Sequence, residues 1–181
     1  MTELDLVGRA RHGDLDAFTA LAGARLAAMT RTAAAILGDE TEAHDAVQEA
    51  LISIWRELPT LREPERFDAW AGRILVNACR HALKRRVRVR VREIALQPEG
   101  AGGPGLPSVG GRADSLDHED ALNRAFERLD AEQRAVLVMH HLEDRPLAEI
   151  AATLGIPEGT AKSRLFTARR ALQKALDREW R

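Results

Sequence analysis

The 181-residue chain suits one or two small domains, and a hydrophobic content of 45% is enough to form packed cores. No apolar run approaches the roughly 20 residues that cross a membrane, and an acidic start with a lone cysteine indicates an intracellular, cytoplasmic protein. A formal net charge of −1 excludes a generic binder of polyanions, although acidic and basic residues are sorted into separate blocks.

The first part of the chain predicts three helices. Asp14 caps one that ends at Gly38, with an apolar face of Phe18, Leu21, Leu26, Met29 and Ile36. A second starts near Thr41 and buries Ala43, Ala46, Val47, Ala50, Leu51, Ile54 and Trp55. A third runs from about Arg66 to Arg86 and buries Phe67, Trp70, Ile74 and Leu75. Residues 87–92 alternate between apolar and basic; lacking a partner strand, they favour a frayed helix end over a short strand.

A linker divides the chain. Residues 98–111 contain nine Gly or Pro in fourteen positions and one charge, so they cannot form a packed core. We therefore expect an all-α protein of two small helical domains, with residues 1–92 in the first, residues 93–113 in a flexible linker and residues 114–181 in the second.

The second domain predicts a helix-turn-helix after two preceding helices. The first of these runs from about Leu116 to Leu129, and Asp130 caps the next with Gln133 as its capping-box partner. In residues 146–165, an apolar helix ends at Gly155 and another begins at Pro157 or Glu158. Such a second helix places its N-terminal part in the major groove of DNA. Its exposed polar and basic residues are Lys162, Ser163, Arg164, Arg169, Arg170 and Lys174.

Two further surfaces lie on the first domain. Asp45, Gln48 and Glu49 share one helix face, which suits an arginine-bearing partner helix or serves only solubility. A basic stripe follows on the third helix, where asparagine can bond a base edge and the cations can hold phosphates; its members are Asn77, Arg80, Lys84 and Arg85. The loop at residues 60–67 could receive an extruded base, although Phe67 and Trp70 have the spacing of core residues.

The sequence shows no catalytic constellation. It has no Gly-rich phosphate loop, no nucleophile elbow and no clustered spacing of metal ligands. We read Cys79, His81, His140 and His141 as ordinary helix residues. We expect no enzymatic activity, no metal and no cofactor.

Three segments in this order resemble the extracytoplasmic-function class of bacterial sigma-70 factors. They are Asp45-Ala46-Val47-Gln48-Glu49-Ala50 with Trp55; Phe67-Asp68-Ala69-Trp70 with Arg73-Ile74-Leu75-Val76-Asn77; and Ala148-Glu149-Ile150-Ala151 with Glu158-Gly159-Thr160-Ala161-Lys162-Ser163-Arg164-Leu165. The likeness covers nearly the whole chain except the linker. The chain departs from the family pattern at His81, where Asp is frequent, and at Thr167, where Arg is common.

The resemblance implies a promoter-specificity subunit of RNA polymerase. Its first domain, like sigma region 2, would dock on core polymerase through Asp45, Gln48 and Glu49. The residues assigned to the minus-10 element are Arg62, Arg66, Asn77, Arg80, Lys84 and Arg85. Its second domain, like sigma region 4, would read the minus-35 element; the residues assigned there are Lys162, Ser163, Arg164, Phe166, Thr167, Arg169 and Arg170. Promoter DNA, core RNA polymerase and an anti-sigma factor are the implied partners of a protein that is monomeric when free.

The reach of the linker favours action within the polymerase. Two promoter elements two helical turns apart are separated by about 70 Å, whereas a free coil of some 22 residues spans about 25 Å. The linker must therefore be held stretched, which a channel in the polymerase would do.

A stand-alone helix-turn-helix regulator, binding operators as a dimer, is the alternative, but it leaves the acidic face and the Asn77 stripe unexplained. A nucleic-acid enzyme is a second rival, and it lacks any carboxylate-metal or histidine-nucleophile arrangement.

Overall fold

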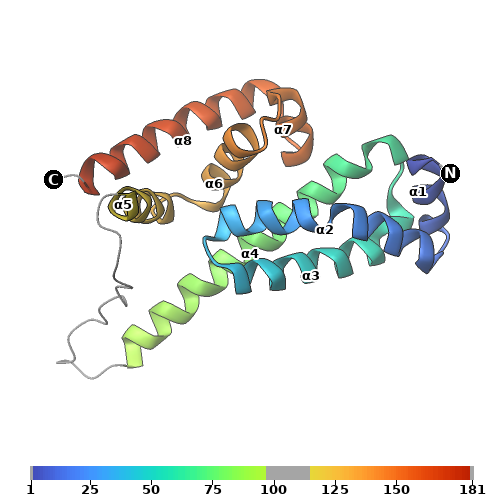
Figure 1. The fold of residues 1–181 in the computed structure, drawn as a ribbon, viewed down its shortest axis with the longest axis horizontal. Helices are drawn as coiled ribbons and strands as arrows, with labels where there is room; N and C mark the ends of the chain where they lie inside the picture. The colour runs from blue at the N-terminus through green and yellow to red at the C-terminus, as the bar shows by residue number, and fades with distance from the viewer. Residues whose placement is uncertain (1, 97–114, 180–181) are drawn as a thin grey trace.

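The computed structural model describes residues 2–96 and 115–179, and every regular element in those ranges is helical (Figure 1). The first unit holds α1 (Glu3–Arg11), α2 (Leu15–Leu37), α3 (Glu40–Glu57) and α4 (Phe67–Leu96). Two single turns of 3-10 helix, Leu58–Thr60 and Pro64–Arg66, connect α3 to α4. The sequence predicted the last three of these helices and missed α1.

Local signals set the helix boundaries. Thr2 and Asp5 form a capping box at the start of α1, which is the signal that sequence reasoning overlooked. Asp14 caps α2 by accepting from the amide of Ala17, as predicted. Gly38 ends α2 with a φ of 70°, a left-handed conformation that glycine adopts without steric cost.

Helix α4 is longer than predicted. It continues ten residues past the expected end at Arg86, so residues 87–92 are helical and the first four residues of the predicted linker also belong to the helix. Thirty residues correspond to about 45 Å, and Figure 1 shows the C-terminal end of α4 projecting beyond α2 and α3. Residues 87–92 have no partner strand, so their backbone N–H and C=O groups form the hydrogen bonds of the helix instead. The rest of the predicted linker, residues 97–113, lies outside the described residues.

The second unit contains the predicted helix-turn-helix. Its elements are α5 (Ser115–Glu127), α6 (Ala131–Leu137), a π-helical turn (Val138–Leu142), α7 (Leu147–Leu154) and α8 (Glu158–Glu179). Asp130 and Gln133 form the expected capping box of α6. Gly155 ends α7 at a φ of 65°, and α8 begins directly after Pro157.

The apolar faces of the helices meet in one continuous core. Its largest fully buried side chains come from both units and include Leu21, Ile36, Leu37, Ile54, Leu58, Val136, Met139 and Ile150. Phe67 is buried as predicted, and Trp55 is half-buried with its ring centroid 4.9 Å from that of Phe18. Leu26, expected on the buried face of α2, is instead 47% exposed.

The two units pack against each other, with α7 lying on α4 (Figure 1). A Cβ built at Gly72 of α4 would lie 3.0 Å from Cγ2 of Thr153 in α7, closer than an ordinary van der Waals contact, so the missing side chain of glycine lets the two helices approach closely. Arg134 of α6 donates to the carbonyl oxygen of Ile36 at 3.1 Å. The described residues therefore form one closed body, which the prediction of two tethered modules did not anticipate.

Burial makes Cys79 a reporter of unfolding. Its side chain is fully buried in α4, and this burial raises the pKa of the thiol to about 12. Because the thiolate is the reactive form, we expect no reaction with a thiol reagent at pH 8 in the folded protein and rapid reaction in urea. Release of thionitrobenzoate from Ellman's reagent measures both rates, and prompt labelling without urea would contradict the buried placement.

Candidate functional site

The predicted acidic residues lie together on an exposed face of α3. Asp45, Gln48 and Glu49 are all exposed, and Ile52, one turn further, is 61% exposed beside them. These four residues line one wall of an open groove of about 820 Å³ between α3 and α4, which we call the docking groove. Its remaining lining residues are Glu42, Ala82, Arg85, Arg86 and Val89.

Ile52 is the member of this face that sequence reasoning missed. Its position follows Asp45 by seven residues, so the helical period of 3.6 places it on the same face as Asp45, Gln48 and Glu49. An exposed isoleucine among carboxylates provides an apolar contact within a charged surface. This combination is typical of a protein-binding face, in which an apolar centre is surrounded by polar residues.

Two arginines of α4 form the opposite wall of the docking groove. Nη1 of Arg85 lies 3.5 Å from Oε2 of Glu49, and Nη2 of Arg86 lies 2.6 Å from Oε2 of Glu42. Arg86 also donates to the carbonyl oxygen of Leu37 at 3.3 Å. The structure therefore places Arg85 next to the acidic face, whereas sequence reasoning grouped it with Asn77 and Arg80.

Asn77 and Arg80 lie one turn apart on α4 and contact each other. Nη2 of Arg80 donates to Oδ1 of Asn77 at 2.7 Å, and both side chains are half-buried. Nη1 of Arg80 also donates to Oε1 of Glu132, in α6, at 3.2 Å. Lys84, the next basic residue of the stripe, is exposed.

The loop before α4 presents its cations but not its aromatic ring. Arg62 and Arg66 are exposed, and Nε of Arg66 lies 2.9 Å from Oε2 of Glu63. The ring of Phe67 is buried, with the guanidinium of Arg25 5.0 Å from its centroid. Asn77 follows ten residues later, about 15 Å along the helix axis, so it lies well away from this loop.

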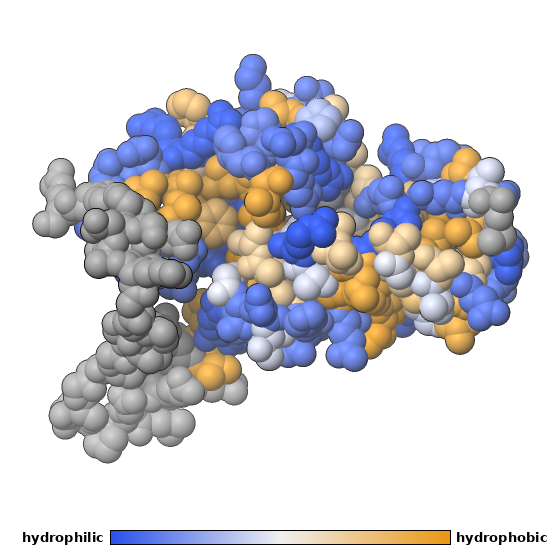
Figure 2. Space-filling view, in the orientation of Figure 1, coloured by the Kyte–Doolittle hydropathy of each residue, from blue (hydrophilic) through white to orange (hydrophobic). Residues whose placement is uncertain are grey.

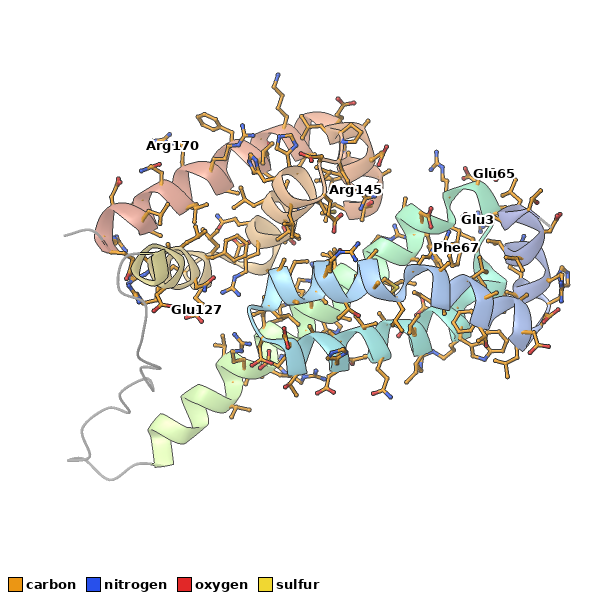
Figure 3. All side chains as sticks on the ribbon, viewed as in Figure 1. Glu3, Glu65, Phe67, Glu127, Arg145 and Arg170 are labelled. Carbon is orange, nitrogen blue, oxygen red and sulfur yellow. The ribbon has the colours of Figure 1, made fainter. Side chains whose placement is uncertain are left out.

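The predicted DNA-reading residues follow the outer side of α8. The exposed ones are Lys162, Ser163, Phe166, Thr167, Arg169 and Arg170. The guanidinium of Arg170 lies 5.8 Å from the centroid of the Phe166 ring, and Figure 3 shows Arg170 on the side of α8 away from α5 and α6. Hydrophilic residues dominate this side of the molecule, which is uppermost in Figure 2. The 5.8 Å distance between Arg170 and Phe166 is within the range of a cation–π contact.

Arg164 and Arg169 are held by neighbouring side chains. Arg164 is half-buried, with Nη1 2.6 Å from Oε2 of Glu132. Nε of Arg169 donates to Nε2 of His141 at 3.1 Å. Desolvation lowers the pKa of His141, and the positive charge of Arg169 lowers it further, so the imidazole is neutral at pH 7 and accepts this bond.

Other classes of site find little support within residues 2–96 and 115–179. No group of three or more His, Cys, Asp or Glu residues there is arranged to hold a metal ion. Among the helices of those ranges, none is both long and apolar enough to pass through a bilayer.

Comparisons with known proteins match both units. The family model "Sigma-70 region 2" matches residues 21–89, and "Sigma-70, region 4" matches residues 119–172. The extracytoplasmic-function (ECF) RNA polymerase sigma factor SigL of Mycobacterium tuberculosis is 33% identical over 154 residues, covering 83% of both chains. SigM of the same species, also named an ECF sigma factor, is 33% identical over 135 residues, which are 75% of this chain and 64% of SigM.

A solved structure has the same fold. It is that of the sigma factor RpoE of Bartonella quintana, solved in complex with the anti-sigma factor NepR. The two chains are 26% identical and superpose with a TM-score of 0.61, over 88% of this chain and 96% of RpoE.

Proposed function

Because this chain belongs to the extracytoplasmic-function class of sigma-70 factors, we propose that it binds core RNA polymerase and directs initiation of transcription at a specific set of promoters. One observation carries the proposal: the helical scaffold presents an acidic, partly apolar face on α3 together with two separate cationic helices, α4 and α8. A stand-alone operator-binding regulator would need only α8. Such a regulator would leave the cationic residues of α4 unused, and the acidic face of α3 requires a partner other than DNA.

The docking groove suits a basic helix of the polymerase. Asp45 and Glu49 offer carboxylates to arginine, Gln48 offers an amide, and Ile52 provides the apolar contact. Arg85 lines the opposite wall, 3.5 Å from Glu49. We therefore place Arg85 in the docking groove rather than on the DNA-binding stripe of α4.

The two cationic helices suit two promoter elements. On α8 the exposed residues Lys162, Ser163, Phe166, Thr167, Arg169 and Arg170 would read or hold the minus-35 element, with Arg164 behind them. On α4 we assign Asn77, Arg80 and Lys84 to the minus-10 element, together with the loop cations Arg62 and Arg66. Because the ring of Phe67 is buried, it is not available to stack on an extruded base. Such a base would instead be held by the polar and cationic groups of the loop.

The remaining partners follow from the same reasoning. A cytoplasmic monomer that meets the polymerase through the docking groove needs no second copy of itself. The Bartonella quintana relative was solved with an anti-sigma factor, which supports a similar inhibitory partner for this chain.

Transcription in vitro tests the proposed function. Core polymerase with this protein, supplied with a library of genomic promoters, should start transcripts at a defined set of sites that core polymerase alone does not use. Start-site mapping then identifies the promoter elements. A stable homodimer in gel filtration that footprints operator DNA without polymerase would instead support the stand-alone regulator.

Replacing Lys162 by alanine should weaken binding at the minus-35 element whatever its sequence. Lys162 is exposed near the start of α8, and we assign its ammonium group to a phosphate of the DNA backbone. The affinity of the holoenzyme for promoter DNA falls as salt is added. We expect the slope of log affinity against log salt concentration to become shallower by about one unit in the variant. Lys174→Ala is the matched control, because Lys174 lies twelve residues, or about 18 Å, further along α8. Equal slopes for both variants would contradict the assignment.

A further inference from the structure

One arginine of α2 holds the end of the loop that precedes α4. Nε of Arg25 lies 2.6 Å from Oδ1 of Asp68, in the first turn of α4, and its guanidinium lies 5.0 Å from the centroid of the Phe67 ring. Nη2 of Arg25 donates to the carboxylate of Glu3, in α1. Nη1 donates to the carbonyl oxygen of Leu21, one turn earlier in α2, at 3.3 Å. A single guanidinium therefore joins α1, α2 and the start of α4.

Arg25 uses its whole planar fork in these contacts. Each of its three nitrogens donates to a different acceptor, and the side chain is only 18% exposed. The carboxylates of Glu3 and Asp68, in contrast, belong to exposed residues. Because its nitrogens already donate within the protein, Arg25 acts on its neighbours rather than on an external ligand.

The loop that Arg25 holds does not fix its own shape. Two single turns of 3-10 helix make up most of residues 58–66, and such turns have poor hydrogen-bond geometry. Side chains buried beneath the loop anchor it instead, since Leu58 is fully buried and Leu61 is 6% exposed. The positions of the exposed cations Arg62 and Arg66 therefore depend on what packs against the loop.

Helix α1 is one of the elements that pack against this loop. It contacts both 3-10 turns, and Figure 1 shows it at the end of the bundle where α3 joins α4. Val7, on the inner face of α1, is fully buried. The helix lies outside residues 21–89, which are the ones that the region 2 model matches. The ion pair between Glu3 and Arg25 links this additional helix to the end of the loop.

The cluster around Arg25 lies next to the proposed DNA-binding loop. Figure 3 shows Glu3, Glu65 and Phe67 at the same end of the molecule, beside α1. Arg66, which the proposed function assigns to the minus-10 element, directly precedes Phe67. A contact that fixes Phe67 therefore also fixes the backbone next to Arg66.

We propose that Arg25 is a positioning residue for promoter opening, which holds residues 58–66 in the shape that receives an extruded base of the minus-10 element. This inference rests on the proposed function, since it takes Arg62 and Arg66 as DNA-binding residues. Only molecules with a correctly shaped loop can capture the base, so a loose loop lowers the rate of opening by the fraction that is competent. Initial binding of the duplex through α8 does not involve this loop.

Two substitutions release the loop from the two sides of one ion pair. Arg25→Met keeps much of the side-chain volume and removes all three donors. Asp68→Ala removes an acceptor at an exposed position, where loss of an ion pair costs the fold little. The second substitution separates geometry from charge. Removal of a carboxylate beside DNA should by itself favour DNA binding, whereas loss of the positioning contact should slow opening.

Glu65→Ala is the matched control. Glu65 is an exposed acidic residue of the same loop, three positions before Asp68, and it lies outside the hydrogen bonds of Arg25. The control removes the same charge from the same region but leaves the contacts of Arg25 intact. Its opening rate constant should equal or exceed that of the wild-type protein. Circular dichroism at the assay temperature checks that each variant keeps its helices, and Asp68→Ala decides the question if Arg25→Met unfolds.

The experiment measures opening by the holoenzyme on a promoter identified by start-site mapping. An adenine of the minus-10 element is replaced by 2-aminopurine, whose fluorescence rises on unstacking and is followed by stopped flow. The dependence on holoenzyme concentration separates the initial binding constant from the opening rate constant. We expect the opening rate constant to fall about fivefold to tenfold in Arg25→Met and in Asp68→Ala, with initial binding unchanged. The double variant should be no slower than Arg25→Met, because both substitutions remove the same contact.

Three results would overturn the inference. One is opening by Asp68→Ala at the wild-type rate or faster, as expected for Glu65→Ala. Another is additive losses in the double variant, since the two residues would then act separately. The third is a loss confined to initial binding and its salt dependence, which would make Arg25 a direct phosphate contact. All three leave the proposed function standing, whereas a wild-type holoenzyme that opens no promoter would refute the proposed function and this inference with it.

Discussion

Replacing Asp45 and Gln48 together by alanine should abolish capture of core RNA polymerase while the helical fold is retained. Both side chains are exposed on α3 and lie in the docking groove beside Ile52, so their removal leaves the core untouched. Truncating a central residue of a protein interface costs about 2 kcal/mol or more. Two such losses correspond to a decrease in affinity of about 10³-fold.

Surface-immobilised core polymerase measures this loss directly. Glu57→Ala is the control, because Glu57 is exposed on the same helix but outside the docking groove. Circular dichroism and the urea midpoint should be the same for all three proteins. Capture of the double variant at wild-type strength would refute α3 as the docking face.

Replacing Arg134 by methionine should lower the free energy of unfolding by about 2–4 kcal/mol. The guanidinium is 4% exposed and donates to three carbonyl oxygens, those of Leu129 and Ile36 at 3.1 Å and that of Glu127 at 2.6 Å. Methionine fills much of the volume but leaves all three acceptors without their donors. The loss is larger than for a surface arginine because buried acceptors cannot turn to water.

Urea unfolding followed by circular dichroism tests this expectation. Arg128→Met is the matched control, since the side chain of Arg128 is 50% exposed and pairs with one carboxylate, that of Glu179, rather than with three buried carbonyl oxygens. Lysine at position 134 should be nearly as destabilising as methionine, because one ammonium cannot span three acceptors held by a planar fork. Equal unfolding midpoints for Arg134→Met and Arg128→Met would contradict the role of the buried guanidinium.

Burial lowers the pKa of Arg134 through desolvation, and the positive charge of nearby Arg86 lowers it further. The guanidinium nevertheless stays charged, as arginine does in proteins, and the three carbonyl dipoles compensate its charge. Removing this guanidinium leaves buried carbonyl oxygens without donors in two places. Leu129 and Glu127 belong to the second unit, and Ile36 belongs to α2. The substitution should therefore destabilise both the second unit and its contact with α2.

The sequence alone determined the helices, their caps and the class of the protein. Asp14, Gly38, Asp130 and Gly155 are local signals, because a cap depends on the residue itself and on the three or four residues beside it. The acidic face of α3 and the exposed side of α8 follow from helical periodicity, which also needs only neighbouring residues. Ile52 could have been found in the same way, and α1 from its capping box.

Only the tertiary structure decided how these surfaces are combined. The two contacts of Glu132 join positions 52 and 32 residues apart, and no local rule relates such positions. Three other contacts are of the same kind, because the packing of helices distant in the sequence sets each of them. They are the contact of Gly72 with Thr153, the hydrogen bond from Arg134 to Ile36 and the ion pair of Arg85 with Glu49. Helix caps and faces are local consequences of the chain, whereas the contact between the two units is a property of surfaces that meet only after folding.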